Sequence, residues 1–325
     1  RRAAYVFNEL AFAPTWRLQA AARLEHVRVG GVASLFPADF LPPIPFVDPA
    51  TEARTRGFTP ASFSLGLLKE LPYGVVASLT AQRVERAPEA LELFARGAHE
   101  ASGTFEIGDP NLRKEEARSI EFGLRRARGD LRFDFSAFHT RYRGFISKRL
   151  TGVLCGEDFE SCGVEDELRQ IVFTQRDATF TGAELAVQYD LMTLGRGLLG
   201  VDGQFDVVRA RFAGGQNVPR IPPMRLGGGV FWRSDAWFAR VGLLHAFEQN
   251  RIKPDEETPT RGYDLLKAEL SYRFKSPTVW GAMETTIGLV GTNLLNDDVR
   301  NHVSFKKDEV LQPGRGVRLF ANVKF

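Results

Sequence analysis

The end of the chain alternates between apolar and polar side chains, which is the pattern that a β-strand imposes on a sequence. One face of the predicted strand is apolar and the other is polar, with Phe320 as the exception on the polar face. The apolar face holds Val317, Leu319, Ala321, Val323 and Phe325, and the polar face holds Arg318, Asn322 and Lys324. Such a strand lines the core of a soluble protein, or it crosses a bilayer in the wall of a barrel. The alternation predicts a strand and leaves both settings open.

Similar alternation recurs along the chain in pairs of segments that are joined by short turns. Phe63, Leu65 and Leu67 alternate with small residues before one such turn, and Leu79 lies in the returning segment. We predict thirteen strands from this pattern, and the chain begins inside a hairpin that turns at Pro14. The predicted strands are 5–13, 15–29, 62–68, 75–82, 120–125, 131–137, 170–190, 197–213, 223–234, 236–249, 261–274, 279–293 and the terminal strand.

Longer connections join successive pairs, and residues 30–57, 86–116 and 152–168 are predicted as long loops. When the C-terminus is placed on the periplasmic side, every short turn falls inside and every long loop falls outside. This asymmetry is typical of outer-membrane barrels. No apolar run approaches the roughly 20 residues of a membrane helix, so only a barrel could carry this chain across a bilayer. The predicted fold class is all-β, a transmembrane antiparallel β-barrel.

Charge, cysteine content and catalytic motifs restrict the function further. The formal net charge of +3 is too small and too evenly spread to indicate a nucleic-acid partner. The two cysteines, Cys155 and Cys162, flank the short segment GEDFES, which predicts a loop disulfide in an oxidising compartment, with two free thiols as the alternative. The motifs Gly-x-Ser-x-Gly and His-Glu-x-x-His are absent from the sequence, so we expect no enzyme.

Three motifs follow one another near the C-terminus, namely Asn293-Leu294-Leu295-Asn296-Asp297, Pro313-Gly314-Arg315 and the terminal Phe325. Their order resembles the end of a TonB-dependent outer-membrane receptor. The resemblance implies a turn that closes the penultimate strand, a last strand opened by Pro-Gly-Arg, and a terminal aromatic residue that serves as an assembly signal. It also implies a barrel that is surrounded by outer-membrane lipid and receives energy from the TonB complex.

The number of predicted strands bears on how much of such a receptor is present. Thirteen is odd, whereas single-chain bacterial barrels have an even number of strands. The first predicted strand begins close to residue 1, so we expect no plug domain within this sequence. From the resemblance we expect residues 1–325 to be the C-terminal portion of a barrel of about 22 strands. The plug and its TonB-contacting segment would then lie outside this sequence.

The predicted loop 86–116 carries a second resemblance. Arg-Ala-Pro at 86–88 and Asp-Pro-Asn-Leu at 109–112 resemble the two boxes that bracket this loop in many TonB-dependent receptors. Glu115 or Glu116 matches the acidic residue that opens the next strand in these receptors. The boxes indicate the receptor superfamily and not its cargo.

The residues between the two boxes resemble the zinc-uptake branch of these receptors, and so does the run 302–308 before the last strand. The resemblance implies a Zn²⁺ cargo taken from the extracellular side. Imidazole nitrogen and carboxylate oxygen are suitable ligands for Zn²⁺. The candidate metal ligands are His99, Glu100, Glu106 and His302.

Other interpretations stay open. A histidine between the two boxes also resembles the haem receptors, in which an imidazole is an axial iron ligand, so haem or a metal–siderophore is a competing cargo. The sequence has five histidines and no His-x-His pair, unlike many metal scavengers. In a purely structural interpretation His99 bonds the loop backbone, Glu100 and Glu106 are solvated, and His302 has no ligand role. No role is assigned to His26, His139 and His245, which fall in predicted strands. A passive porin and a barrel hydrolase are the remaining alternatives.

Overall fold

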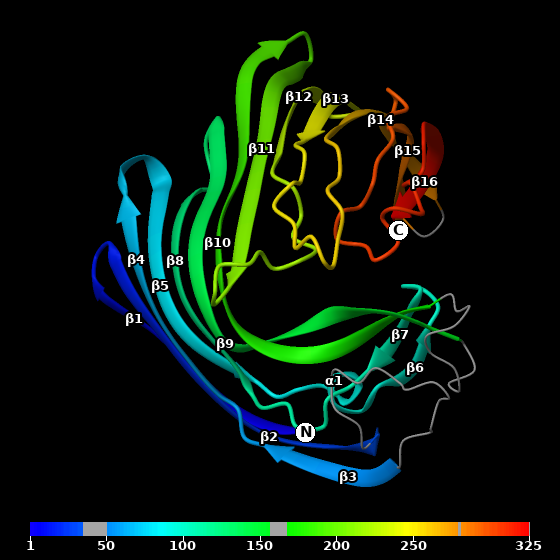
Figure 1. Ribbon diagram of the computed structural model, residues 1–325. Coiled ribbons are helices and arrows are strands. Elements are labelled where there is room, and N and C mark those ends of the chain that lie inside the picture. Colours follow the sequence, from blue (N-terminus) through cyan, green and yellow to red (C-terminus); the bar gives the residue numbers. More distant parts are fainter. Residues whose placement is uncertain (35–50, 157–167, 279–280, 325) are drawn as a thin grey trace.

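The computed structural model describes residues 1–34, 51–156, 168–278 and 281–324, and strands make up nearly all of the regular structure (Figure 1). Thirteen of the strands follow one another as hydrogen-bonded neighbours in one sheet. They are β1 (Arg2–Ala13), β2 (Trp16–Ser34), β4 (Ala61–Leu71), β5 (Val75–Arg86), β8 (Glu115–Arg126), β9 (Leu131–Cys155), β10 (Leu168–Leu194), β11 (Gly197–Phe212), β12 (Arg225–Ser234), β13 (Trp237–Ala246), β14 (Tyr263–Thr278), β15 (Gly281–Thr292) and β16 (Gly316–Lys324).

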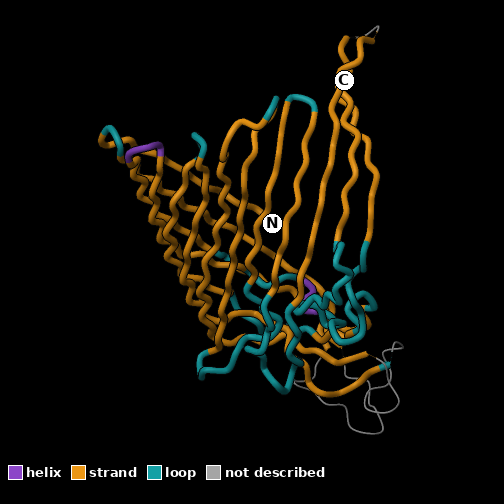
Figure 2. The backbone as a smooth tube through the Cα atoms, turned by 90° about the horizontal axis from the view of Figure 1, so that it is seen from above, coloured by secondary structure: helices purple, strands orange, loops and turns teal. Residues whose placement is uncertain are grey.

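Each strand of this series is antiparallel to the next, and together they form a strongly curved sheet (Figure 1). Among the described strands the curve is open, because β1 and β16 stand at its two ends and do not pair with each other. The short turns lie at one end of the strands and the long connections gather at the other (Figure 2). We call these the turn end and the loop end. The all-β prediction is confirmed, and the series has as many strands as the sequence predicted.

Three shorter strands and one helix lie off this series, and they correct the predicted loops. The strands are β3 (Thr51–Phe58), β6 (Arg96–His99) and β7 (Thr104–Ile107), and the helix is α1 (Ala90–Phe94). The prediction of a loop over 30–57 is wrong at both ends, because β2 continues to Ser34 and pairs with β3. The predicted loop 86–116 contains α1, β6 and β7. β5 and β8 stay paired beyond their apolar residues, in a part where charged side chains replace the apolar alternation. Arg83 of β5 and Glu116 of β8, for example, form an ion pair at 2.5 Å.

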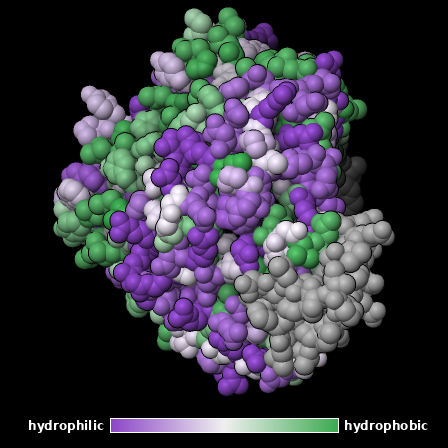
Figure 3. All heavy atoms as spheres, viewed as in Figure 1, coloured by the Kyte–Doolittle hydropathy of each residue, from purple (hydrophilic) through white to green (hydrophobic). Residues whose placement is uncertain are grey.

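The two faces of the sheet differ in polarity. Leu319, Leu289 and Leu270 are paired across β16, β15 and β14, and they expose 70%, 47% and 47% of their surface. On the opposite face, Arg240 reaches across β12 to bond Asp202 on β11 at 2.5 Å, passing over Gly229, which has no side chain to block it. Figure 3 shows hydrophobic residues along the left margin of the curve and hydrophilic residues over its interior. The apolar face is the outer face, as in a barrel whose wall meets lipid.

Aromatic side chains mark the turn end of the outer face. Trp237 and Tyr272 pack with ring centroids 4.6 Å apart, and Trp16 lies 4.4 Å below the ammonium group of Lys69. Tyr73, in the 3-10 turn η1 (Pro72–Gly74), is 86% exposed. Rings that combine an apolar body with a polar edge favour the boundary between hydrocarbon and headgroups. In the described part of the chain, no helix has the length and apolar content needed to span a membrane.

The predicted closing motif forms a turn that is bonded to the start of the last strand. Asn293 and Asn296 have φ values of 47° and 58°, a left-handed conformation that asparagine tolerates. The Asn293 side chain donates to the Pro313 carbonyl at 3.3 Å, and Asn296 Oδ1 accepts from the Arg315 amide at 3.0 Å. These bonds join the Asn293–Asp297 motif to the Pro313–Arg315 motif. The terminal Phe325 lies outside the described residues.

Candidate functional site

The long connections at the loop end pack together into one unit (Figure 2). We define the loop cluster as residues 87–114, 213–224, 247–262 and 293–315, together with the ends of β9 and β10 that they contact. The principal buried apolar core lies here, at the mouth of the curve, because the wall turns its apolar residues outward. The loop cluster holds all four predicted metal ligands.

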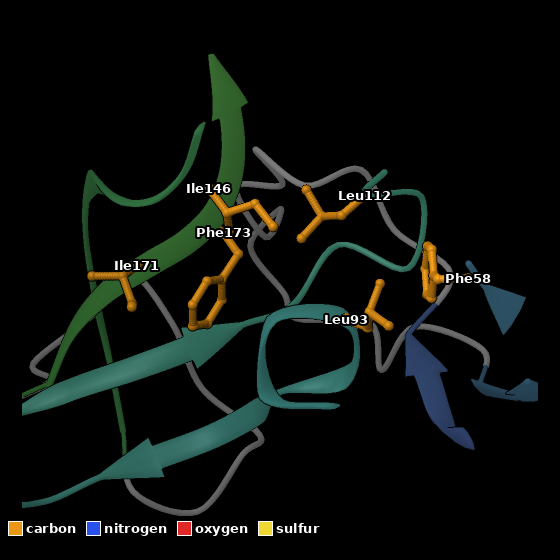
Figure 4. Packing of buried hydrophobic residues seen from close by; sticks show 6 residues of the cluster. All are labelled: Phe58, Leu93, Leu112, Ile146, Ile171 and Phe173. Carbon is orange, nitrogen blue, oxygen red and sulfur yellow. The ribbon is translucent and has the colours of Figure 1, made fainter. Parts of the chain in front are cut away.

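Helix α1 anchors the first part of the loop cluster. A capping box formed by Glu89 and Glu92 starts the helix, and Arg86 binds Glu92 at 2.7 Å and Glu115 at 3.3 Å. Leu93 is fully buried, and Figure 4 shows it among the apolar side chains from β9, β10 and the following loop. The buried members of this core are Phe58, Leu93, Leu112, Ile146, Ile171 and Phe173. The segment between the two sequence boxes is therefore a packed structure.

The hairpin of β6 and β7 follows the helix and joins two distant parts of the chain. β7 pairs with β10 in parallel, with Thr104 opposite Arg169, which is the one parallel pairing among the described strands. At the hairpin turn, Lys306 Nζ donates to the carbonyl oxygen of Glu100 at 2.8 Å. Arg169 also donates to the carbonyl oxygen of Phe305. The two stretches that resemble the zinc-uptake branch thus contact each other.

His99 and Glu100 lie at the exposed tip of this hairpin. His99 Nδ1 is 2.7 Å from Ser102 Oγ, and Ser102 Oγ is 2.6 Å from Thr104 Oγ1. The hydroxyl contact fixes the orientation of the imidazole ring and leaves Nε2 as the nitrogen directed away from this chain of bonds. An oriented, exposed imidazole can serve as a metal ligand, and Glu100, the next residue, carries a carboxylate.

Glu106 lies at the base of the same hairpin and is 2% exposed. Lys148 Nζ donates to Glu106 Oε1 at 2.6 Å, and the other carboxylate oxygen, Oε2, has no partner in the described structure. The Lys148 ammonium lies 5.4 Å from the ring centroid of Phe173 and 5.9 Å from that of Phe305. The predicted interpretation of Glu106 as a solvated surface charge is wrong, because the hairpin buries it in an ion pair.

His302 occupies a different part of the loop cluster. It is 2% exposed, its Nδ1 lies 3.0 Å from Thr260 Oγ1, and its Nε2 lies 3.3 Å from Glu257 Oε2. Burial raises the pKa of the Glu257 carboxyl, but the nearby His302 imidazole, the backbone amide of Arg220 and the charge of Lys307 lower it by more, so the net pKa shift is downward. Burial lowers the pKa of Lys307. His302 connects loops through a buried ionic group.

The structure brings the four predicted ligands into one region without gathering them around one point. His99 and Glu100 share the hairpin tip, Glu106 is held by Lys148, and His302 is held by Thr260 and Glu257. Among the described residues no three His, Cys, Asp or Glu side chains are close enough to hold a metal ion together. Metal binding by these residues stays a prediction.

Sequence reasoning did not identify the cations of this cluster. Arg220 contacts Glu256 at 3.7 Å and lies 4.3 Å from the ring centroid of Phe305, and Lys253 contacts Glu256 at 2.8 Å. Burial lowers the pKa of Arg220 despite these two glutamates nearby, Glu256 and Glu257. The charge run at 253–257 resembles an ordinary solvated loop, so the sequence carried no signal for its burial.

The predicted disulfide involves one described cysteine. Cys155 is fully buried at the end of β9, where it packs with Phe105 and Ile107 of the hairpin. No free cysteine is found among the described residues. Cys162 lies outside the described residues, so its pairing with Cys155 stays a prediction.

Comparison with known proteins assigns the family. Residues 1–294 match the family described as TonB dependent receptor-like, beta-barrel. Among solved structures, the chain is similar to the copper transporter OprC, with a TM-score of 0.71 and 18% identity over 99% of this chain and 47% of that one. The ferric citrate transporter FecA in its unliganded form gives a TM-score of 0.62 and 15% identity over 99% of this chain and 44% of that one.

A third similar structure is the hemophore receptor HasR of Serratia marcescens, a double mutant in complex with its hemophore HasA and heme. It gives a TM-score of 0.58 and 14% identity over 99% of this chain and 50% of that one. The chain spans about half the length of these three receptors. At these identities the similarity to solved structures shows the fold, whereas the family match covers most of the chain. The chain belongs to the TonB-dependent receptor-like β-barrel family and lies in the outer membrane of a Gram-negative bacterium.

Proposed function

We propose that the chain is the C-terminal barrel portion of a TonB-dependent receptor that takes up a scarce metal, with Zn²⁺ as the cargo. In this proposal the cargo binds at the loop end, on the extracellular side. The TonB complex supplies energy through a plug domain that belongs to the complete receptor. The protein acts as a receptor and transporter and not as an enzyme.

The observation that supports this proposal best is the position of His99. Its ring is oriented by Ser102 on an exposed hairpin tip, and Glu100 follows it directly. The hairpin is held by β10 on one side and by Lys306 on the other, so the tip keeps its place at the mouth of the curve. One imidazole and one carboxylate make an incomplete zinc site, which suits a cargo that must be released again. We propose that the plug completes the ligand set.

Haem is the second candidate cargo, and the same observation supports it. A single exposed imidazole is sufficient as an axial ligand of haem iron, whereas a closed zinc site needs about four ligands. A metal–siderophore would use the same mouth through polar contacts. The test must therefore include more than one cargo.

The test is a calorimetric titration of Zn²⁺ into the complete receptor in detergent, with haemin titrated in parallel by absorbance. We expect zinc binding that weakens at least tenfold in His99→Ala and is unchanged in His26→Ala, which removes another exposed histidine from the wall strand β2. Equal zinc affinity in wild type and His99→Ala would remove His99 from the site. Haemin binding without zinc binding would make haem the cargo, and binding of neither would leave an organic chelate.

A further inference from the structure

A row of arginines crosses neighbouring strands on the outer face of the wall. Arg83 on β5 is directly opposite Arg118 on β8, and Arg118 is directly opposite Arg141 on β9. Beyond Arg141 the row continues through Thr179 on β10 to Arg211 on β11. Directly paired residues of neighbouring strands project from the same face of a sheet. These side chains therefore point to the outside of the curve.

The arginine row lies where the apolar part of the outer face ends, on the side toward the loop end. On β8, the outward residues from the turn end are Leu124, Phe122 and Ile120, and the next outward residue is Arg118. On β5 the apolar outward residues likewise end where Arg83 begins. A strand needs roughly 9–11 residues to cross the hydrocarbon layer, which is about the length between the aromatic turn end and this row. The arginines stand where hydrocarbon gives way to the headgroups of the outer leaflet.

The charge of this surface is not balanced by the protein. Arg83 and Arg118 share Glu116, at 2.5 and 2.7 Å, and Arg83 also contacts Glu85 at 2.6 Å. Four further arginines are exposed on the same face, and in the described structure they form no ion pair. They are Arg141, Arg143, Arg209 and Arg211. A guanidinium group at a membrane boundary attracts anionic headgroups, and its planar donors match the oxygens of a phosphate.

Two adjoining hollows on the outer face are lined by these arginines. One, of about 700 Å³, has Phe63, Leu65 and Ile120 on its apolar side and Arg83, Arg118 and Arg141 on its basic side. The second, of about 520 Å³, extends the basic side to Arg143 and Arg211, and Glu116 and Asp177 also line it. An apolar floor beside a basic rim is complementary to a molecule with an acyl chain and a phosphorylated head.

The opposite part of the wall lacks this arrangement. At the loop end of β13 and β14, the outward pair is His245 and Asp264, 2.8 Å apart, and the neighbouring outward residue of β12 is Leu226. The row is therefore not a general belt around the barrel, because the outer face of β12 to β14 lacks it. Only where the arginines border the hollow beside Phe63 and Ile120 do a basic rim and an apolar floor meet, which indicates a binding site for one lipid in a defined place.

We propose that the arginine row of β5, β8, β9 and β11 binds the phosphate groups of an anionic, phosphorylated lipid of the outer leaflet, whose acyl chain covers Phe63, Leu65 and Ile120. The site lies on the outside of the wall, separate from the cargo site at the mouth. It fixes the depth and rotation of the barrel in the membrane.

The test measures binding of diphosphorylated lipid A to the complete receptor in detergent by native mass spectrometry. The test variant is Arg141→Gln/Arg211→Gln, which removes two unpaired charges and leaves no carboxylate without its partner. The matched control is Arg128→Gln/Arg196→Gln, which removes two exposed arginines at the turn end. We expect at least tenfold weaker lipid A binding in the test variant, unchanged binding in the control, and unchanged zinc binding in both.

A charge-preserving variant, Arg141→Lys/Arg211→Lys, separates binding from folding, and we expect it to retain more lipid A than the glutamine variant. The site is refuted if the test variant binds lipid A like the wild type, or if the control loses as much. It is also refuted as a lipid site if inorganic phosphate displaces lipid A at equal concentration, because the acyl chain would then contribute nothing.

Discussion

The wall and the loop cluster use the same residue types in opposite ways. Leu319 on the wall is 70% exposed, whereas Leu93 in the loop cluster is fully buried. Asp202 and Arg240 meet on the open inner face of the wall, whereas Glu106 is buried with Lys148. The wall is surrounded by lipid and hydrogen-bonded through its strands, so it needs no apolar interior. The loop cluster lies in water and must bury its own core.

This difference predicts where substitutions are costly, and the largest effect is expected at the buried ion pair. Lys148→Ala leaves the Glu106 carboxylate buried without a partner, which should destabilise the loop cluster by about 3–5 kcal/mol. The measurement is the rate of limited proteolysis of the loops as a function of temperature. The double variant Glu106→Leu/Lys148→Met should recover most of the loss. Equal protection in Lys148→Ala and wild type would contradict the role of this pair.

The next effect is expected in the apolar core of the loop cluster. Leu93→Ala creates a cavity among Leu112, Ile171 and Phe173, so it should destabilise the loop cluster by about 2–5 kcal/mol. The same proteolysis assay reports the change, and the strands of the wall should keep their protection. A uniform loss of protection over wall and loops would show that the two regions do not unfold separately.

Acidification should act on the loop cluster and leave the wall in place. The pKa of Glu257 in the folded state lies below its ordinary value of 4.5. The ionised carboxylate therefore stabilises the folded state above about pH 4.5, and this contribution is lost as the pH falls through the folded-state pKa. We expect loop protection to be constant from about pH 7 to 5 and to fall below pH 4.5. In Glu257→Gln this acid step should shrink. A step of unchanged size in that variant would assign the acid sensitivity to another group.

The smallest effect is expected on the outer face of the wall. Leu319→Ala removes methyl groups that contact lipid, and lipid fills the space, so the loss should stay below about 1 kcal/mol. Thermal unfolding of the barrel in lipid vesicles measures it beside Leu93→Ala. A loss as large as that of Leu93→Ala would mean that Leu319 is packed against protein.

The same contrast explains what the sequence could predict. The alternation of Val317, Leu319 and Ala321 reports a local property of a strand, so the series of strands and their order were predictable. The Asn293 turn was predicted from the resemblance of its motif to the end of a TonB-dependent receptor, and its bonds to Asp297 and Pro313 agree with that prediction. The family match and the outer-membrane location agree with the resemblance drawn from these motifs.

The loop cluster was less predictable because its contacts join residues that are far apart in sequence. His302 contacts Thr260, and Lys306 bonds Glu100, which is 206 positions away in the sequence. No local sequence pattern predicts such pairs. The extensions of β2 and β9 were missed because glycines interrupt their alternation. Gly30 and Gly31 lie in the extension of β2, which pairs with β3, and Gly144 and Gly152 lie in the extension of β9. For the candidate ligands, the sequence placed His99 in the loop 86–116, but it carried no signal for the burial of Glu106 and His302.

TonB-coupled zinc uptake through His99 is the central prediction for this receptor. The measurement is the accumulation of radioactive zinc by cells that produce the complete receptor, with and without TonB, as wild type, His99→Ala and His26→Ala at equal receptor levels. We predict TonB-dependent accumulation in wild type and His26→Ala, and its loss in His99→Ala. Accumulation that persists without TonB, or that is equal in wild type and His99→Ala, would contradict the account.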